Sequence, residues 1–320
     1  MLRNQKIAVA GNKWITEYLI TSLVECGYKP SLLIHMSPDK SKNISGYKNL
    51  SGFAEKNGIE VYHPQVYTLK SENDRKNLEC KEIDLLFVFG WQRLIPAWLI
   101  NHSSLGVYGV HGGPEKPPRC RGQAVFNWAI LLGYTNFYMY LFEIDTGVDS
   151  GRILEMTEFD ILPHDDIQSV YHKNCVVSCR MILKYLPLLL DKKVKPTKQP
   201  DGEPSVLPRR VPENGGIHWD EPAEKVANLI RAVNTPYPGA FTFLESMKVK
   251  IEEGHIFDNK ITYDAVPGEI VNLFPGGHFV VMAKDLPLYV RRYSCCDPEK
   301  IARGKIFQLH SGIKQDDPIV

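Results

Sequence analysis

The sequence lacks the features of several protein classes. It has 38 basic and 37 acidic residues, so the basic surplus typical of proteins that bind mainly nucleic acid is missing. No stretch approaches the ~18 apolar residues of a membrane helix. The apolar run near the N-terminus, Ile7–Ala10, is too short for a secretory signal. We therefore expect a cytoplasmic protein with no membrane partner.

Metal-binding and disulfide patterns are also missing. The 7 cysteines are an odd number, and they include no CxxC pair and no Cys/His cluster at the spacing of a zinc site. We therefore expect no metal and a set of reduced, mostly buried thiols. Cys120 is the one that we expect to be most exposed, because it lies in a Gly/Pro-rich loop.

The remaining composition is that of a globular protein, and 320 residues are enough for two domains. The first half alternates short apolar strands with helical patterns, which predicts an open α/β sheet. The strands are expected at Lys6–Ala10, Pro30–Ile34, Glu60–Tyr62 and Asp84–Phe89. Ligands of such sheets bind beyond the carboxyl ends of the strands. A long helix is predicted at Asp165–Leu186, with Pro187 marking a break or kink near its end.

The second half begins with a segment rich in proline. Pro196–Pro212 holds five prolines in 17 residues, which favours an extended linker. After a helix at Glu221–Val233, short β-rich runs separated by Gly/Pro turns predict a small barrel. We therefore expect a domain over 1–195, a linker over 196–213 and a second domain over 214–320.

Two polar side chains have the surroundings of catalytic groups. His111 follows the apolar run Val107–Val110 and precedes two glycines, so a ligand can approach it, and a histidine suits proton transfer. Asp149 lies between Gly147 and Gly151, where it can orient an imidazole and stabilise its cation. A loop histidine without a role and a turn aspartate are the alternatives, and Asp145 competes with Asp149 for the same assignment.

The order of several motifs resembles the N10-formyltetrahydrofolate-dependent formyltransferases, including those that modify methionyl-tRNA and nucleotide sugars. The matching segments are Asp84–Pro96 (DLLFVFGWQRLIP), Gly109–Ala129 (GVHGGPEKPPRCRGQAVFNWA), Ile144–Ile153 (IDTGVDSGRI) and Ile217–Phe241 (IHWDEPAEKVANLIRAVNTPYPGAF). The resemblance covers roughly Lys6 to Val290. It implies a Rossmann-like catalytic domain followed by an OB-like β-barrel domain.

The resemblance assigns catalytic roles by position. His111 matches the family's catalytic histidine and Asp149 its catalytic aspartate. The family's third residue is an asparagine that donates to the developing oxyanion, and this chain has Gly109 there. Losing one such donor can cost ~2.7–4 kcal/mol of transition-state stabilisation. We expect the loop Gly112–Pro118, which is longer than is typical of the family, to compensate; Asn127 is a weaker candidate.

The resemblance also implies N10-formyltetrahydrofolate as co-substrate, with its pterin end held by segments after two strands. The matching residues are Trp91, Arg93, Leu94, Ile95, Ile144, Asp145, Thr146 and Val148. For Leu94 and Ile95, ordinary core packing is equally consistent with the residues.

The second domain bears on the identity of the amine that receives the formyl group. Asn214–Val320 holds 8 Lys and 4 Arg against 14 Asp and Glu, hence a net charge of 12 − 14 = −2, which disfavours RNA. We therefore expect a nucleotide-linked amino sugar of surface glycan synthesis, and a homodimer is compatible with this branch. The candidate substrate contacts are Lys13, Gly113, Arg119, Arg121 and Arg209. Methionyl-tRNA formylation and a catalytically impaired folate-binding protein, the latter because of Gly109, are the alternatives.

Overall fold

The computed structural model describes residues 5–308, which form two compact units. The first unit contains the residues up to 121, 138–159 and 172–205. The second contains 122–137, 160–171 and the residues from 206 onward. None of the helices in the described range has both the length and the apolar character needed to cross a membrane. The domain boundaries expected from the sequence remain a proposal.

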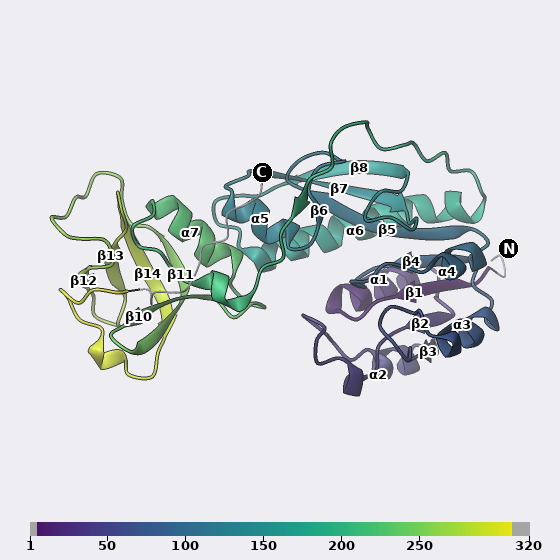
Figure 1. Ribbon diagram of the computed structural model, residues 1–320, viewed down its shortest axis with the longest axis horizontal. Helices are drawn as coiled ribbons and strands as arrows, with labels where there is room; N and C mark the ends of the chain where they lie inside the picture. Colours follow the sequence, from purple (N-terminus) through teal and green to yellow (C-terminus); the bar gives the residue numbers. More distant parts are fainter. Residues whose placement is uncertain (1–4, 309–320) are drawn as a thin grey trace. The chain divides into compact units, whose positions relative to one another are not determined.

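The first unit is built on a seven-stranded sheet with the order β3-β2-β1-β4-β5-β7-β8 (Figure 1). The strands are β1 (Ile7–Ala10), β2 (Leu32–Ile34), β3 (Glu60–Tyr62), β4 (Leu85–Val88), β5 (Gly106–Gly113), β7 (Asn136–Glu143) and β8 (Ile153–Asp160). The first five are parallel, and β7 runs antiparallel to β5. This arrangement confirms the open α/β sheet, because β1, β2 and most of β4 are buried as the apolar runs predict.

Helices connect these strands, and most of them follow the apolar periodicity of the sequence. They are α1 (Trp14–Glu25), α2 (Ser51–Lys56), α3 (Glu72–Glu79), α4 (Ala97–His102) and α6 (Ile167–Leu190). The helix does not break at Pro187, because α6 continues through this proline to Leu190. The chain accommodates it near the helix end, where Asp191 N donates to Pro187 O at 3.0 Å.

Two features of the sheet determine where ligands can bind. From β1 the chain adds β2 and then β3 on one side of the sheet. It then crosses to the other side of β1, where β4 lies, so the strand order reverses between β1 and β4. Such a switch point opens a crevice at the carboxyl ends of the strands. In addition, β5 extends beyond the end of β4. Val88, the last residue of β4, pairs with Gly109, and from Val110 onward β5 pairs only with β7.

The second unit contains a five-stranded antiparallel sheet with the order β10-β11-β14-β13-β12. The strands are β10 (Ala240–Leu244), β11 (Met247–Ile256), β14 (Pro287–Ser294), β13 (Phe279–Met282) and β12 (Ile270–Leu273). Gln308 bridges to Phe243 on β10, and Ile306 bridges to Glu269 before β12, so one segment spans both edges of the sheet. This closure agrees with the small OB-like barrel that the sequence predicts.

Helices α5 (Val125–Leu131) and α7 (Ala223–Ala232) also belong to the second unit, as does β9 (Val206–Leu207), which pairs with β6 (Arg121–Gly122). Asn127 of α5 donates from Nδ2 to Ala232 O at 2.7 Å. The side-chain amide of Asn127, the weaker candidate to replace the family's catalytic asparagine, is therefore already bonded to α7.

Asp74 of α3 ties together a segment that lies next to the switch point. Its carboxylate accepts hydrogen bonds from Tyr62 Oη at 2.8 Å, Gln65 N at 2.6 Å, Val66 N at 3.2 Å and Ser71 Oγ at 2.7 Å. Burial alone raises the pKa of this carboxyl, but the hydrogen bonds outweigh burial and hold the pKa below its usual value.

We predict that Asp74→Asn lowers the free energy of unfolding by about 1–3 kcal/mol at neutral pH, because the amide cannot accept the full set of bonds. The folded-state pKa of Asp74 is depressed, so its contribution is present above the unfolded pKa and is lost as pH falls through the folded pKa. Urea denaturation at pH 7 and at stepwise lower pH measures both effects. A difference between variant and wild type that stays constant below pH ~4 contradicts this account.

Candidate active site

The structure brings His111 and Asp149 into contact, although 38 positions separate them in the chain. His111 Nε2 lies 3.6 Å from Asp149 Oδ2, and the two side chains are 12% and 24% exposed. His111 belongs to β5, which continues two residues past it to Gly113. The strand continues because β7 pairs with it, and Tyr140 is directly opposite His111.

The neighbours of His111 indicate which ring nitrogen carries the proton. Nε2 lies 3.2 Å from the carbonyl oxygen of Cys120, which can only accept a hydrogen bond. In the neutral ring Nε2 therefore donates to Cys120 O, with the Asp149 carboxylate on the same side. Nδ1 is then the basic nitrogen of the pair.

The loop that carries Asp149 is held by its own polar side chains. Asp145 Oδ1 accepts from Gly147 N at 2.9 Å and from Ser150 Oγ at 2.8 Å, so Asp145 organises the loop while Asp149 faces the histidine. Asp149 adopts a φ of 50°, in the left-handed region that aspartate tolerates better than most residues. This backbone conformation stores local strain that the surrounding contacts must offset.

Gln199 supplies those contacts, although no motif in the sequence points to this residue. Its Nε2 donates to Asp149 O at 2.7 Å and to Gly151 O at 3.0 Å. Its Oε1 accepts from Arg121 Nη2 at 2.9 Å. The side chain is buried, although it lies within the proline-rich segment that the sequence describes as a linker. Through Gln199, the proline-rich segment therefore holds the Asp149 loop in place.

Ile144 occupies the space beside Gly109. A Cβ atom at position 109 would lie 2.9 Å from Ile144 Cδ1 and 3.3 Å from Ile144 Cγ1. These distances are shorter than ordinary van der Waals contact, so a larger residue at 109 requires Ile144 to move. The glycine and the isoleucine thus fit each other, and Gly109 offers the site only backbone groups.

Two buried donors near His111 have no hydrogen-bond partner among the described residues: Tyr140 Oη and Arg121 Nε. The Tyr140 ring meets the His111 ring edge to face, with centroids 5.7 Å apart. Burial and, after it, the Asp149 carboxylate raise the pKa of Tyr140 well above its usual value, so its hydroxyl stays protonated. Both groups are therefore available to an acceptor that enters the site.

Cys120 is buried, so the expectation that it is the most exposed thiol is wrong. Its neighbour across the loop is Gly113, where an added Cβ would lie 2.6 Å from Cys120 Cβ. Burial raises the pKa of the Cys120 thiol, which makes it a poor nucleophile. All seven cysteines are free thiols, as expected, but only Cys120, Cys175 and Cys179 are buried.

The residues expected to hold the pterin divide into three groups. Trp91 and Ile95 are buried in one hydrophobic cluster, and Ile144 packs against the same cluster. Leu94 and Val148 are instead exposed apolar side chains, at 50% and 48%. The remaining three residues, Arg93, Asp145 and Thr146, are exposed, and the Arg93 guanidinium lies 4.8 Å from the Tyr67 ring centroid.

The expected substrate contacts differ in their surroundings. Arg119 forms an ion pair with Glu115 at 2.6 Å, and Arg121 is bonded to Gln199. Gly113 is buried at the end of β5, and Arg209 is an exposed residue of the second unit. Burial lowers the pKa of Lys13, which follows β1, to about 8.

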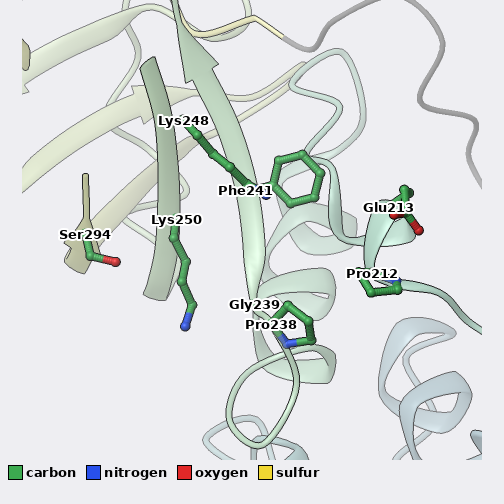
Figure 2. A pocket seen from close by; sticks show the side chains of 8 residues that line it. All are labelled: Pro212, Glu213, Pro238, Gly239, Phe241, Lys248, Lys250 and Ser294. Carbon is green, nitrogen blue, oxygen red and sulfur yellow. The ribbon is translucent and has the colours of Figure 1, made fainter. Parts of the chain in front are cut away.

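The second unit contains a pocket of about 340 Å³ that the sequence did not predict. Figure 2 shows that Lys248 extends over the Phe241 ring, 3.9 Å from the ammonium to the ring centroid. Lys250 lies 3.7 Å from Glu252 Oε1. Because both lysines already have partners, this pocket carries no assigned ligand.

Comparisons with known proteins agree with this geometry. The family model described as "Formyl transferase" matches residues 39–183, and "Formyl transferase, C-terminal domain" matches residues 210–304. A curated relative is the bifunctional polymyxin resistance protein ArnA of Wigglesworthia glossinidia brevipalpis, 28% identical over 260 residues. The match covers 80% of this chain and 38% of ArnA, so the chain spans well under half of that relative.

Two solved structures share the fold. The N-formyltransferase from Helicobacter canadensis, in complex with folinic acid and dTDP-3-aminofucose, matches with a TM-score of 0.66 and 18% identity, over 90% of this chain and 99% of that chain. HypX from Aquifex aeolicus, in complex with tetrahydrofolic acid, matches with a TM-score of 0.62 and 17% identity, over 91% of this chain and 44% of HypX. With both halves matched by the family models, the chain belongs to the formyl transferase family.

Proposed function

We propose that this protein is an N-formyltransferase that moves a formyl group from N10-formyltetrahydrofolate to the amine of a nucleotide-linked amino sugar in surface glycan synthesis. The observation that carries the proposal is the contact of His111 Nε2 with Asp149 Oδ2 at 3.6 Å. It joins a base and a carboxylate, which is the arrangement that removes a proton from an attacking amine.

The comparisons support the nucleotide-sugar branch. The Helicobacter canadensis enzyme binds dTDP-3-aminofucose, and it is matched over nearly the full length of both chains. The acidic balance of Asn214–Val320 points in the same direction, because a surface that holds RNA needs a positive surplus. Methionyl-tRNA formylation is therefore the less favoured reading.

The residues present fit a folate. Trp91 and Ile95 are buried in one apolar cluster against which the half-buried Ile144 packs, and the exposed Leu94 and Val148 can cover a flat ring. N10-formyltetrahydrofolate supplies the formyl carbon that the amine attacks. Backbone groups between Gln92 and Ile95 are then the polar contacts that orient the pterin.

The protein's own groups handle the proton. With Nε2 donating to Cys120 O, His111 Nδ1 accepts a proton from the amine as the new nitrogen–carbon bond forms. The Asp149 carboxylate stabilises the resulting imidazolium. His111 then returns the proton to the nitrogen that leaves the formyl carbon, so the ring ends neutral.

Several hydrogen-bond donors can act in place of the family's asparagine, which is Gly109 in this chain. Beyond Gly109, β5 has a ladder partner on one side only, which leaves alternate backbone N–H groups directed away from β7. Tyr140 Oη and Arg121 Nε are further donors, both buried and without partner among residues 5–308. We propose that these groups stabilise the negative charge that develops on the formyl oxygen.

The test of the proposed function is incubation of the full chain with N10-formyltetrahydrofolate and a panel of amino-sugar nucleotides, read by mass for a formyl increment. Unformylated methionyl initiator tRNA is tested alongside, with binding measured by gel shift and formylation by mass. If folate binds tightly but no amine in the panel gains a formyl group, the protein is the impaired folate-binding alternative.

We predict that His111→Ala and Asp149→Asn each lower kcat by about 10²–10⁴-fold, because each removes part of the proton-transfer pair. Steady-state kinetics with the accepted sugar nucleotide measure this, and urea denaturation checks that the fold is retained. Matched controls are His164→Ala and Asp201→Asn, which alter exposed residues. A near-native kcat in either the His111 or the Asp149 variant would show that these two residues do not act as the proposed base and its carboxylate partner.

We predict that Gly109→Asn alone lowers stability without raising turnover, because its Cβ meets Ile144. Combining it with Ile144→Ala removes both clashing carbons. If the site lacks a donor, the double variant gains about 10²–10³-fold in kcat over Ile144→Ala alone. If existing donors compensate, as we propose, its kcat equals that of Ile144→Ala within a small factor.

We predict that Tyr140→Phe lowers kcat by roughly 10-fold or more with little change in the KM for folate, because a buried donor is lost near the reacting atoms. Tyr108→Phe is the matched control, since Tyr108 is a buried phenol on the opposite face of β5. Equal kcat values for the two variants mean that the Tyr140 hydroxyl has no part in the reaction.

A further inference from the structure

Two residues beside His111 have a backbone conformation that residues other than glycine seldom adopt. Cys120 has a φ of 60° and Asp149 a φ of 50°, so both lie in the left-handed region. Cys120 accepts from His111 Nε2 through its carbonyl oxygen, and Asp149 faces the same nitrogen through its carboxylate. Strain of this kind persists only where surrounding contacts hold the backbone, and it is most frequent at active sites.

One stretch of chain supplies contacts to both strained residues. We call residues 197–205 the bracing segment. It begins with a bridge to the first residue of β8, where Thr197 N donates to Ile153 O and Ile153 N donates to Thr197 O, each at 2.8 Å. Because Ile153 comes shortly after Asp149 in the chain, this bridge ties the start of the bracing segment to the end of the Asp149 loop.

Ser205 is the contact of the bracing segment with Cys120. Its Oγ accepts from Cys120 N at 2.9 Å, and its carbonyl oxygen accepts from Arg121 N at 2.9 Å. Two successive peptide N–H groups are therefore fixed by one residue that lies 85 positions after Cys120. Ser205 thus acts on the imidazole indirectly, since it holds Cys120 and the carbonyl of Cys120 accepts from His111 Nε2.

Gln199 makes the corresponding contact with the other strained residue, through its bonds to Asp149 O and Gly151 O. It also accepts from Arg121 Nη2, so Arg121 is bonded to the bracing segment through both its guanidinium and its backbone N–H. A single segment therefore fixes both sides of the contact between His111 and Asp149, and the arginine that lies beside them.

The side chains between these two residues face solvent. Lys198 and Asp201 pair with each other at 2.7 Å and are 82% and 91% exposed, and Glu203 is also exposed. Gln199 is only 7% exposed. A glutamine is seldom buried unless its hydrogen bonds are satisfied there, and a mere linker between domains has no need of one. The inward position therefore has a role beyond chain connection.

We propose that Ser205 and Gln199 are positioning residues for formyl transfer. Ser205 holds the Cys120 carbonyl that orients the His111 ring, and Gln199 holds the loop that presents the Asp149 carboxylate to that ring. The inference rests on the proposed roles of His111 and Asp149. Loss of either positioning residue misplaces the base without removing it, and a displacement of about 1 Å can lower a rate by ~10²-fold.

Steady-state kinetics of the full chain with N10-formyltetrahydrofolate and the accepted amine test the inference. Ser205→Ala removes the acceptor of Cys120 N, and Gln199→Glu keeps the acceptor for Arg121 but removes the donor to the two carbonyls. We expect each variant to lower kcat by about 10–100-fold with KM values near native, because the reacting groups are displaced while the binding surfaces are unchanged.

Two further serine variants serve as controls. Ser205→Thr keeps the hydroxyl and is expected to restore kcat to nearly the native value. Ser104→Ala removes a serine hydrogen bond to Asp84 Oδ1, 2.7 Å long, elsewhere in the first unit, and is expected to keep the native kcat. Urea denaturation of all variants measures how much stability each change removes.

Double variants separate positioning from a general loss of stability. If Ser205 acts through His111, Ser205→Ala leaves the residual rate of His111→Ala nearly unchanged, because residues that act as a unit are not additive. The same holds for Gln199→Glu combined with Asp149→Ala. A loss of equal factor in the native and the truncated backgrounds shows that the residue acts elsewhere, and it overturns the inference.

The protonation of the His111 ring gives a readout that needs no turnover. Nitrogen-15 NMR of the neutral histidine rings distinguishes a protonated from an unprotonated nitrogen, and His111→Ala assigns the signal. In the native protein we expect Nε2 to carry the proton, because Cys120 O can only accept. Ser205→Ala releases that carbonyl, so both tautomers become populated, whereas Ser205→Thr and Ser104→Ala give the native spectrum.

The two readouts distinguish failure of the inference from failure of the proposed function. A native kcat in either Ser205→Ala or Gln199→Glu, or an unchanged His111 spectrum in Ser205→Ala, overturns the inference, while formyl transfer by the native chain leaves the enzyme standing. If no amine is formylated but Ser205→Ala mixes the tautomers of His111, the proposed function fails and the role of the bracing segment stands.

Discussion

The geometry of the candidate active site depends on one structural constraint, which is that β5 continues past the end of β4. Gly109 is the last residue of β5 that pairs with β4, and His111 lies two residues further, held only by β7. A strand fixes a side chain more firmly than a loop does, while the missing neighbour leaves one side of His111 accessible. Because His111 is fixed on a strand, the contact with Asp149 depends mainly on the position of the Asp149 loop. Gln199 holds that loop through hydrogen bonds to the carbonyl oxygens of Asp149 and Gly151.

The first unit retains several polar groups that would be costly in a core without function. Asn12 Nδ2, Trp91 Nε1, Arg121 Nε and Tyr140 Oη are each buried without a partner in the described residues. An unsatisfied buried donor costs about 1–3 kcal/mol, which is large against a typical net stability of 5–15 kcal/mol. Two of them lie at the switch point and two beside His111.

Much of the fold follows from local sequence, and the site follows in part. The apolar runs around Ala10 and Phe87 predict buried parallel strands, and the Gly-flanked positions of His111 and Asp149 identify the pair that the structure joins. Gln199 was not predictable, because its role depends on bonds to residues about 50 positions away and its sequence context is that of a linker. The continuation of β5 was missed for the same reason, since glycines weaken a strand signal unless the partner strand is known.

Gly109 and Ile144 show how a departure from a family pattern can be consistent within one chain. An asparagine at 109 would need the space that Ile144 fills, and Ile144 in turn packs against the cluster of Trp91 and Ile95. The apolar cluster of Trp91 and Ile95 and the absence of a side-chain donor at 109 are therefore parts of one packing arrangement. Under the proposed function, the oxyanion donors come from other elements, and Tyr140 on β7 and Arg121 on β6 carry buried donors without a partner among residues 5–308.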